Sequence, residues 1–149
     1  MILQLALSLA VLLTALALVP GGAHLLELVN KLKLGEREYF IVQSIYRGWA
    51  LVGFVVSAAF AANVWAAVLQ RGHGAPFWLS VAAAALVLAT LGVFFRWTQP
   101  VNKSTNDWSV QPEDLQPLRR QWEYSHAANA ILTFMALCCA TLAAVTGSG

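Results

Sequence analysis

Hydrophobic positions dominate four long stretches of the chain, and polar positions gather between them. Each stretch carries no Lys, Arg, Asp or Glu, and together they cover 1–26, 48–70, 72–95 and 124–149. Every stretch is long enough to cross, as an α-helix, the roughly 30 Å hydrocarbon core of a bilayer. The pattern therefore predicts an all-α, polytopic membrane protein built as a bundle of four transmembrane helices.

The length of the chain matches one such bundle. With 149 residues there is no room for a second folded unit beside the four helices. We expect a single transmembrane domain over residues 1–149. Its predicted spans lie at about 2–29, 39–69, 76–97 and 116–145.

Basic residues are distributed unevenly between the connections. Of the nine Lys and Arg residues, only Arg71 lies between the second and third uncharged stretches, and the other eight lie between the first and second or between the third and fourth. Short loops rich in Lys and Arg stay in the cytoplasm. We therefore expect a multi-pass protein of the inner (plasma) membrane, with loops 1 and 3 cytoplasmic and both termini outside.

Composition supports a membrane location and argues against some other classes. The chain is 59% hydrophobic and 11% charged, whereas a soluble domain carries about 25% charged residues. Its net charge of +2 is too small to favour nucleic acid as a partner, so the expected partner is the lipid bilayer. Cys138 and Cys139 are adjacent inside the fourth span, which favours helix packing over a disulfide framework.

A polar stripe descends along the fourth predicted span. Its members recur at spacings of three and four, and so lie on a single helical face. A polar stripe inside an apolar span is costly unless it faces protein or water, so we expect this face to point into the bundle. The stripe consists of Arg119, Trp122, Glu123, His126, Asn129 and Thr133.

The first predicted span offers a matching pair. His24 and Glu27 are three residues apart, as are Glu123 and His126, but in the reverse order. The two spans run antiparallel in the expected topology, so both histidines lie at the deeper level and both glutamates nearer the cytoplasm. Within each pair, the two residues differ in height along the helix axis by about 4.5 Å. We expect the four side chains to face each other across the inner mouth of the bundle.

This arrangement leaves three interpretations open. In the first, a single transition metal is bound by His24, Glu27, Glu123 and His126, since helical bundles build metal sites from Glu and Glu-x-x-His pairs. In the second, a histidine acts as a general base while an arginine stabilises an oxyanion. In the third, the four residues form a structural seal. The arginine candidates are Arg47, Arg96 and Arg119.

Two pieces of sequence near the inner mouth resemble a known family. The first is 95–102, followed by Trp108, and the second is 119–126. They resemble the anthrone-oxygenase-like family of small four-helix membrane proteins, whose pattern is Pro-x-Asn, a Trp in the loop, and Arg-x-x-Trp-x-x-x-His. The matching positions here are Pro100, Asn102, Trp108, Arg119, Trp122 and His126.

The resemblance implies an oxidoreductase that acts on hydrophobic aromatic or quinone-type molecules, because fungal members are implicated in oxidising anthrones to anthraquinones. It implies that His126 is the base and that His24 is a second base or co-ligand. Many members carry an Arg shortly after the histidine, where this chain has 127–129, Ala-Ala-Asn. The expected substrate contacts are Asn102, Trp122, Tyr46, Gln43 and Arg119.

A second class of function fits the same pattern. A non-catalytic membrane protein that supports assembly, stability or transport needs no bound cofactor and no substrate. The second and third spans carry few polar residues, so a transport path would require a homo-oligomer. The chain contains no phosphate-binding loop and no dinucleotide fingerprint.

Overall fold

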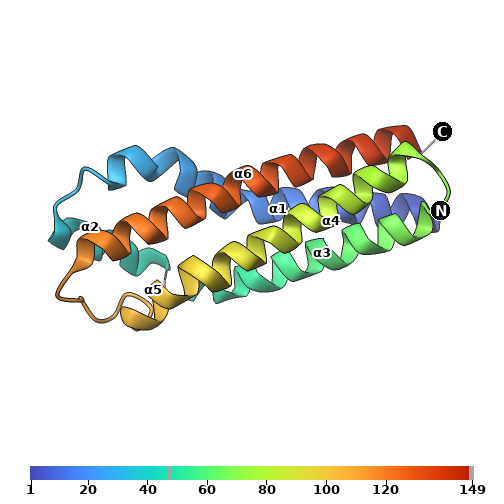
Figure 1. Cartoon of the computed structure of the whole chain (residues 1–149). Coiled ribbons are helices and arrows are strands. Elements are labelled where there is room, and N and C mark those ends of the chain that lie inside the picture. Colours follow the sequence, from blue (N-terminus) through green and yellow to red (C-terminus); the bar gives the residue numbers. More distant parts are fainter. Residues whose placement is uncertain (47, 148–149) are drawn as a thin grey trace.

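The computed structural model describes residues 1–46 and 48–147, which form helices and connecting turns without any strand. Four long helices lie side by side, and both termini lie at the end that holds the turn between α3 and α4 (Figure 1). Shorter helices lie at the opposite end of the bundle. The long helices are α1 (Ile2–Lys31), α3 (Val52–Leu69), α4 (Ala75–Val93) and α6 (Leu115–Gly147).

Four helical segments are long and apolar enough to cross a membrane. They are Ile2–Lys31, Val52–Leu69, Ala75–Ser104 and Leu115–Gly147. This confirms the predicted all-α bundle of four membrane-spanning helices and supports a multi-pass membrane protein. Large apolar side chains such as Leu12 and Phe54 are exposed on its outer surface, as expected for contact with lipid.

Small residues hold the long helices together. Helix α1 packs against α3 and α6, and α4 packs against the same two helices. The buried apolar positions are mostly alanines, such as Ala10 and Ala66 at the contact of α1 with α3. Lipid is as apolar as a leucine side chain, so close approach of small residues favours association of helices in a membrane. Gly21 of α1 is one such position, since a Cβ there would lie 3.4 Å from the Cα of Ala130 in α6.

The second predicted span is interrupted near its inner end. The continuous helix expected over 39–69 is divided into α2 (Glu36–Gln43), η1 (Ser44–Tyr46), η2 (Trp49–Leu51) and α3. Gly48 explains the interruption, because its φ of +84° lies in the left-handed region, which a right-handed helix cannot use. Only the part within α3 is a candidate membrane span, and α2 lies at the end of the bundle (Figure 1).

The third predicted span continues further than expected. After α4 the chain forms a π-helical turn, η3 (Phe94–Thr98), and then α5 (Gln99–Ser104). Pro100 has no backbone N–H, so the regular hydrogen-bond ladder cannot continue unchanged. Within this wider turn the carbonyl of Trp97 accepts a hydrogen bond from Gln121 Nε2 at 2.8 Å. The turn thereby links the third span to α6.

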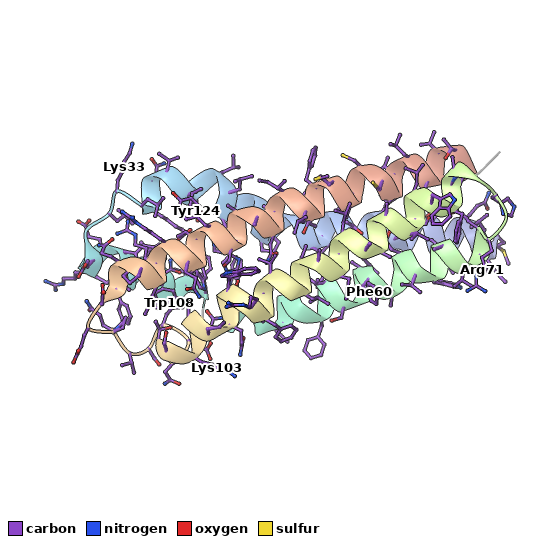
Figure 2. The ribbon with its side chains drawn as sticks, in the orientation of Figure 1. Lys33, Phe60, Arg71, Lys103, Trp108 and Tyr124 are labelled. Atoms are coloured by element: carbon purple, nitrogen blue, oxygen red, sulfur yellow. The ribbon has the colours of Figure 1, made fainter. Side chains whose placement is uncertain are left out.

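The labelled basic side chains fall at the two ends of the bundle. Lys33 and Lys103 lie at the end that carries the short helices, whereas Arg71 lies at the end that carries both termini (Figure 2). This is the arrangement that the loop charges predict. The orientation of the bundle across the membrane stays a prediction.

Candidate functional site

Two histidines meet where α1 packs against α6. The rings of His24 and His126 stack with their centroids 4.4 Å apart and their planes inclined by 26°. Trp122, one turn before His126 on α6, lies 4.1 Å from the ring of His126 and 4.9 Å from that of His24. His24 is buried, with 4% of its surface exposed. The structure therefore brings together the two imidazoles that the sequence placed on opposing helices.

Lys31 occupies the centre of the polar cluster. Its Nζ lies 2.9 Å from Glu27 Oε2 and 3.8 Å from Glu123 Oε1, so one ammonium lies between the two carboxylates. The same Nζ donates to the hydroxyl of Tyr46 at 2.6 Å and lies 3.1 Å from Nδ1 of His24. In the sequence, Lys31 counted only as one of the basic residues that predict the orientation of the bundle. Its spacing of four from Glu27 and seven from His24 was the available sign that the three share a face.

Glu123 is fully buried, and α2 supplies its hydrogen bonds. Its Oε1 accepts from the hydroxyl of Tyr39 at 2.9 Å and from Nε2 of Gln43 at 3.1 Å. Burial, together with the negative charge of Glu123, raises the pKa of Tyr39. Gln43, an expected substrate contact, therefore binds a carboxylate of the protein. A buried charge needs such partners, which explains why α2 folds back onto α6.

Arg119 binds backbone carbonyls at the C-terminal end of α1 and in the turn that follows. Its guanidinium donates to the backbone carbonyls of Leu34, at 3.0 Å, and of Lys31. It also lies over the ring of Tyr39, 4.4 Å from the centroid. The last carbonyls of a helix lack partners within the helix, so these bonds cap α1. These contacts use Arg119 within the protein, and its expected contact with a substrate stays a prediction.

Asn102 is linked to the site by a hydrogen bond with Trp122. Its Oδ1 accepts a hydrogen bond from Nε1 of Trp122 at 2.9 Å, which fixes the plane of the indole against the histidines. Trp108 packs edge-on against Trp122, with ring centroids 5.4 Å apart. Asn102 and Trp108 therefore orient Trp122. Both belong to the sequence pattern on which the family resemblance was based.

Arg96, another arginine proposed for an oxyanion, packs on its own neighbour in η3. Arg96 is exposed on η3 and lies over its neighbour Trp97, 5.4 Å from the ring centroid. Arg47 lies outside the described residues. Lys31 is thus the cation that the described residues bring to His24.

A metal site is not formed by the predicted ligands. Across residues 1–46 and 48–147, no three or more His, Cys, Asp or Glu side chains are grouped so that they could hold a metal ion. The Lys31 ammonium lies between the two carboxylates, and the side chain of Glu27 is 46% exposed. Two stacked imidazoles beside a protein cation are a poor ligand set.

An apolar groove of ≈ 400 Å³ lies on the side of the bundle, between α1 and the start of α3. Trp49 forms part of its wall, and its ring lies 5.1 Å from that of Tyr46 and 6.3 Å from that of His24. A hydrophobic molecule in the groove would therefore contact Trp49, which neighbours both of these rings. The groove is lined by Leu16, Val19, Pro20, Ala23, Gly48, Trp49, Leu51, Val52 and Val55.

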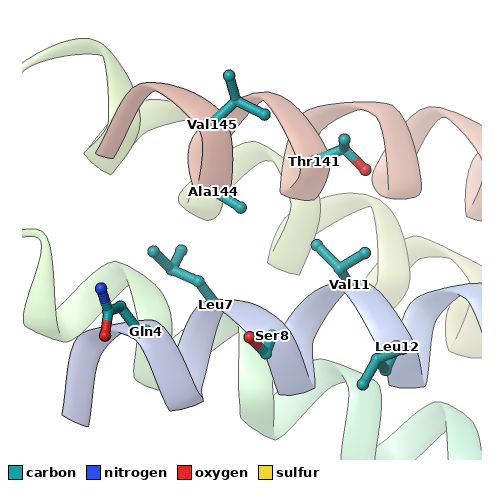
Figure 3. A pocket seen from close by; sticks show the side chains of 8 residues that line it. All are labelled: Gln4, Leu7, Ser8, Val11, Leu12, Thr141, Ala144 and Val145. Carbon is teal, nitrogen blue, oxygen red and sulfur yellow. The ribbon is translucent and has the colours of Figure 1, made fainter. Parts of the chain in front are cut away.

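A second groove, of ≈ 490 Å³, lies between α1 and α6 near the termini. Figure 3 shows Leu7 and Val11 directed from α1 toward α6. Gln4, Ser8 and Thr141 are its polar lining residues, and none of the lining side chains titrates. It therefore lacks the acid, base and cation found at the opposite end.

Within residues 1–46 and 48–147, several buried polar atoms around the histidines have no hydrogen-bond partner. They include Nε2 of His126, Oε2 of Glu123 and Oε1 of Gln43. An unpaired buried polar atom is costly, so each of these atoms favours a ligand or water that can pair with it.

Comparison of the chain with protein-family models, with curated proteins and with solved structures finds no match.

Proposed function

We propose that this membrane protein binds a flat, hydrophobic aromatic or quinone-type molecule and moves a proton at the His24–His126 pair. The observation that carries the proposal is the position of these imidazoles. They lie against Trp122, and Trp49, whose ring lies 6.3 Å from that of His24, forms part of the wall of an apolar groove on the side of the bundle. Ligand sites commonly combine an apolar lining with a few polar groups in this way.

The proposed chemistry starts with a base. A histidine that is neutral has a free ring nitrogen, which can accept a proton from an acidic phenol or from the activated CH₂ group of an anthrone. The Lys31 ammonium, 3.1 Å from His24 Nδ1, would stabilise the anion that results. Dioxygen then oxidises the anion: the CH₂ carbon gains one oxygen atom as a carbonyl, and the other oxygen leaves with the two hydrogens as water.

The test is the oxidation of 1,8-dihydroxyanthrone by detergent-purified protein. We expect dioxygen uptake and quinone formation that fall by about two orders of magnitude in His126→Ala, which is the usual contribution of a general base. His73→Ala is the matched control, because His73 is exposed in the turn between α3 and α4. Equal rates with wild-type protein, with His126→Ala and without protein would reject the proposed activity.

A structural role is the second candidate, and the Lys31 network favours it. Lys31, Glu27 and Glu123 tie the end of α1 to α6, as a seal on the bundle would. A seal predicts that His126→Ala lowers the melting temperature modestly and that no aromatic compound binds. The catalytic proposal predicts near-normal melting with loss of turnover.

The proposed orientation places this site at the cytoplasmic side of the inner membrane, with both termini outside. Its support is the number of basic residues in loops 1 and 3, which exceeds that in loop 2.

A further inference from the structure

The side chain of Tyr46 is surrounded as a bound phenol would be. Its ring centroid lies 4.5 Å from that of His24, 5.1 Å from that of Trp49 and 5.6 Å from that of Trp122. Lys31 Nζ lies over the same ring, 4.4 Å from the centroid. The ring is thus enclosed by three aromatic side chains and one cation.

The hydroxyl of Tyr46 has two hydrogen-bond partners, one donor and one acceptor. It accepts a hydrogen bond from Lys31 Nζ at 2.6 Å and donates one to Glu27 Oε2 at 2.9 Å. A donor and an acceptor placed at one oxygen atom recognise a neutral hydroxyl group, which can accept from the ammonium and donate to the carboxylate. A hydrocarbon of the same shape would leave both partners unpaired.

Tyr46 occupies this place from a short element. It is the last residue of the three-residue turn η1, close to Gly48, whose backbone is left-handed. A side chain on such a turn can leave its contacts without unfolding one of the long helices. Trp49, which packs edge-on against the ring of Tyr46, also forms part of the wall of the apolar groove.

We propose that Tyr46 is an internal mimic of the ligand, and that a hydroxylated arene displaces it to place its own hydroxyl between Lys31 and Glu27. This inference rests on the proposed binding of aromatic molecules and narrows it to arenes that carry a hydroxyl group. Lys31 is then the residue that selects the ligand. Only hydrogen bonds and ring contacts are exchanged in this step, and no covalent bond changes.

The test measures binding of 2-naphthol and naphthalene to detergent-purified protein by quenching of tryptophan fluorescence. Tyr46→Ala removes the side chain that competes for the site, so this variant should bind 2-naphthol at least about tenfold more tightly than wild type, the worth of one hydrogen bond to a charged group. Naphthalene should bind Tyr46→Ala more weakly than 2-naphthol does, also by about tenfold.

A second pair of variants tests the role of the cation. Lys31→Met should lose much of the preference for 2-naphthol over naphthalene, because only the Glu27 acceptor remains, whereas the exposed Lys33→Met should keep the preference of wild type. Tyr46→Phe keeps the packing of the ring but frees Lys31 and Glu27, so it should bind 2-naphthol more tightly than wild type. If Lys31→Met does not fold, Tyr46→Ala and Tyr46→Phe still decide the question.

Two outcomes overturn the inference. One is that Tyr46→Ala binds 2-naphthol no more tightly than wild type, and the other is that it binds both compounds equally. These outcomes are independent of the anthrone assay. If anthrone is oxidised but the binding of 2-naphthol does not depend on Tyr46, only this inference is rejected. If the binding of 2-naphthol depends on Tyr46 but anthrone is not oxidised, only the proposed oxidation is rejected.

Discussion

The imidazole of His24 stacks on that of His126 at a centroid distance of 4.4 Å, although the two residues belong to the first and last helices. The contact depends on the antiparallel packing of α1 on α6, which brings Gly21 against Ala130 nearby. Because stacked imidazoles of the same charge would repel each other, the pair favours at most one added proton. At least one ring of the pair therefore stays neutral, which is the form in which an imidazole can accept a proton.

Removing the buried cation should destabilise the protein strongly. Lys31→Met leaves Glu123, which is fully buried, without the ammonium between it and Glu27. We expect a loss of about 3–5 kcal/mol, the usual result of breaking a buried ion pair from one side. Thermal unfolding in detergent measures the change, and Lys33→Met serves as the exposed control. Adding Glu123→Gln to Lys31→Met should recover part of the loss, and strictly additive effects would contradict the pairing.

Gly48 and Gly53 should respond to alanine in opposite directions. Neither has any atom within 4 Å of an added Cβ, so crowding does not decide the outcome. Gly48 has a φ of +84°, and Gly48→Ala should cost about 1–2 kcal/mol in backbone energy. Gly53 lies within α3, where Gly53→Ala should stabilise by about 0.5–1 kcal/mol. The melting temperatures of the two variants should therefore move apart, and a shift of both in one direction would argue against the turn at Gly48.

Stability should fall in alkaline solution partly because of Tyr39. Burial and the charge of Glu123 raise the pKa of Tyr39 above its ordinary value of about 10. The folded protein therefore holds the phenolic proton when the unfolded chain has released it. This contribution to stability is complete below about pH 10 and is lost as the pH rises toward the folded-state pKa.

The measurement compares melting temperatures of wild type and Tyr39→Phe between roughly pH 9 and pH 11. Wild type should lose more stability over this interval than Tyr39→Phe does. Tyr124→Phe is the matched control, since Tyr124 is exposed on α6. If the melting temperature falls with pH equally in wild type and in Tyr39→Phe, Tyr39 does not contribute to the loss of stability in alkaline solution.

The predicted orientation places both termini outside the cell membrane. Reporter fusions should read periplasmic at the C-terminus and cytoplasmic when inserted near Ser109, in the exposed connection between α5 and α6. A cytoplasmic C-terminus would invert the bundle and move the polar site to the outer side. The anthrone assay on purified protein would be unaffected by that result.

Much of the fold could be predicted because membrane helices are specified locally. An uncharged stretch of sufficient length must satisfy its backbone within itself, so the four helices follow from hydrophobic length alone. The break at Gly48 and the π-helical turn before Pro100 could not be located in this way. Each depends on a backbone conformation that a neighbouring element makes favourable.

Part of the candidate site also followed from periodicity. The three-residue spacings of His24 with Glu27 and of Glu123 with His126 predicted that the histidines share a level, and the structure places their rings in contact. Periodicity could not show that Arg119 is used to cap α1, or that Gln43 binds Glu123. Those partners lie on elements whose approach depends on packing.

The sequence by itself determined four apolar helices, the faces on which their polar residues lie, and the end of the bundle at which those residues collect. These properties are set by helical geometry and by the cost of placing charge in lipid. Only the tertiary structure decided that Lys31 lies between two carboxylates and that Tyr46 fills the space between His24, Trp49 and Trp122. Long side chains at the end of a helix can reach several partners, and the one they take is fixed by which helices pack together.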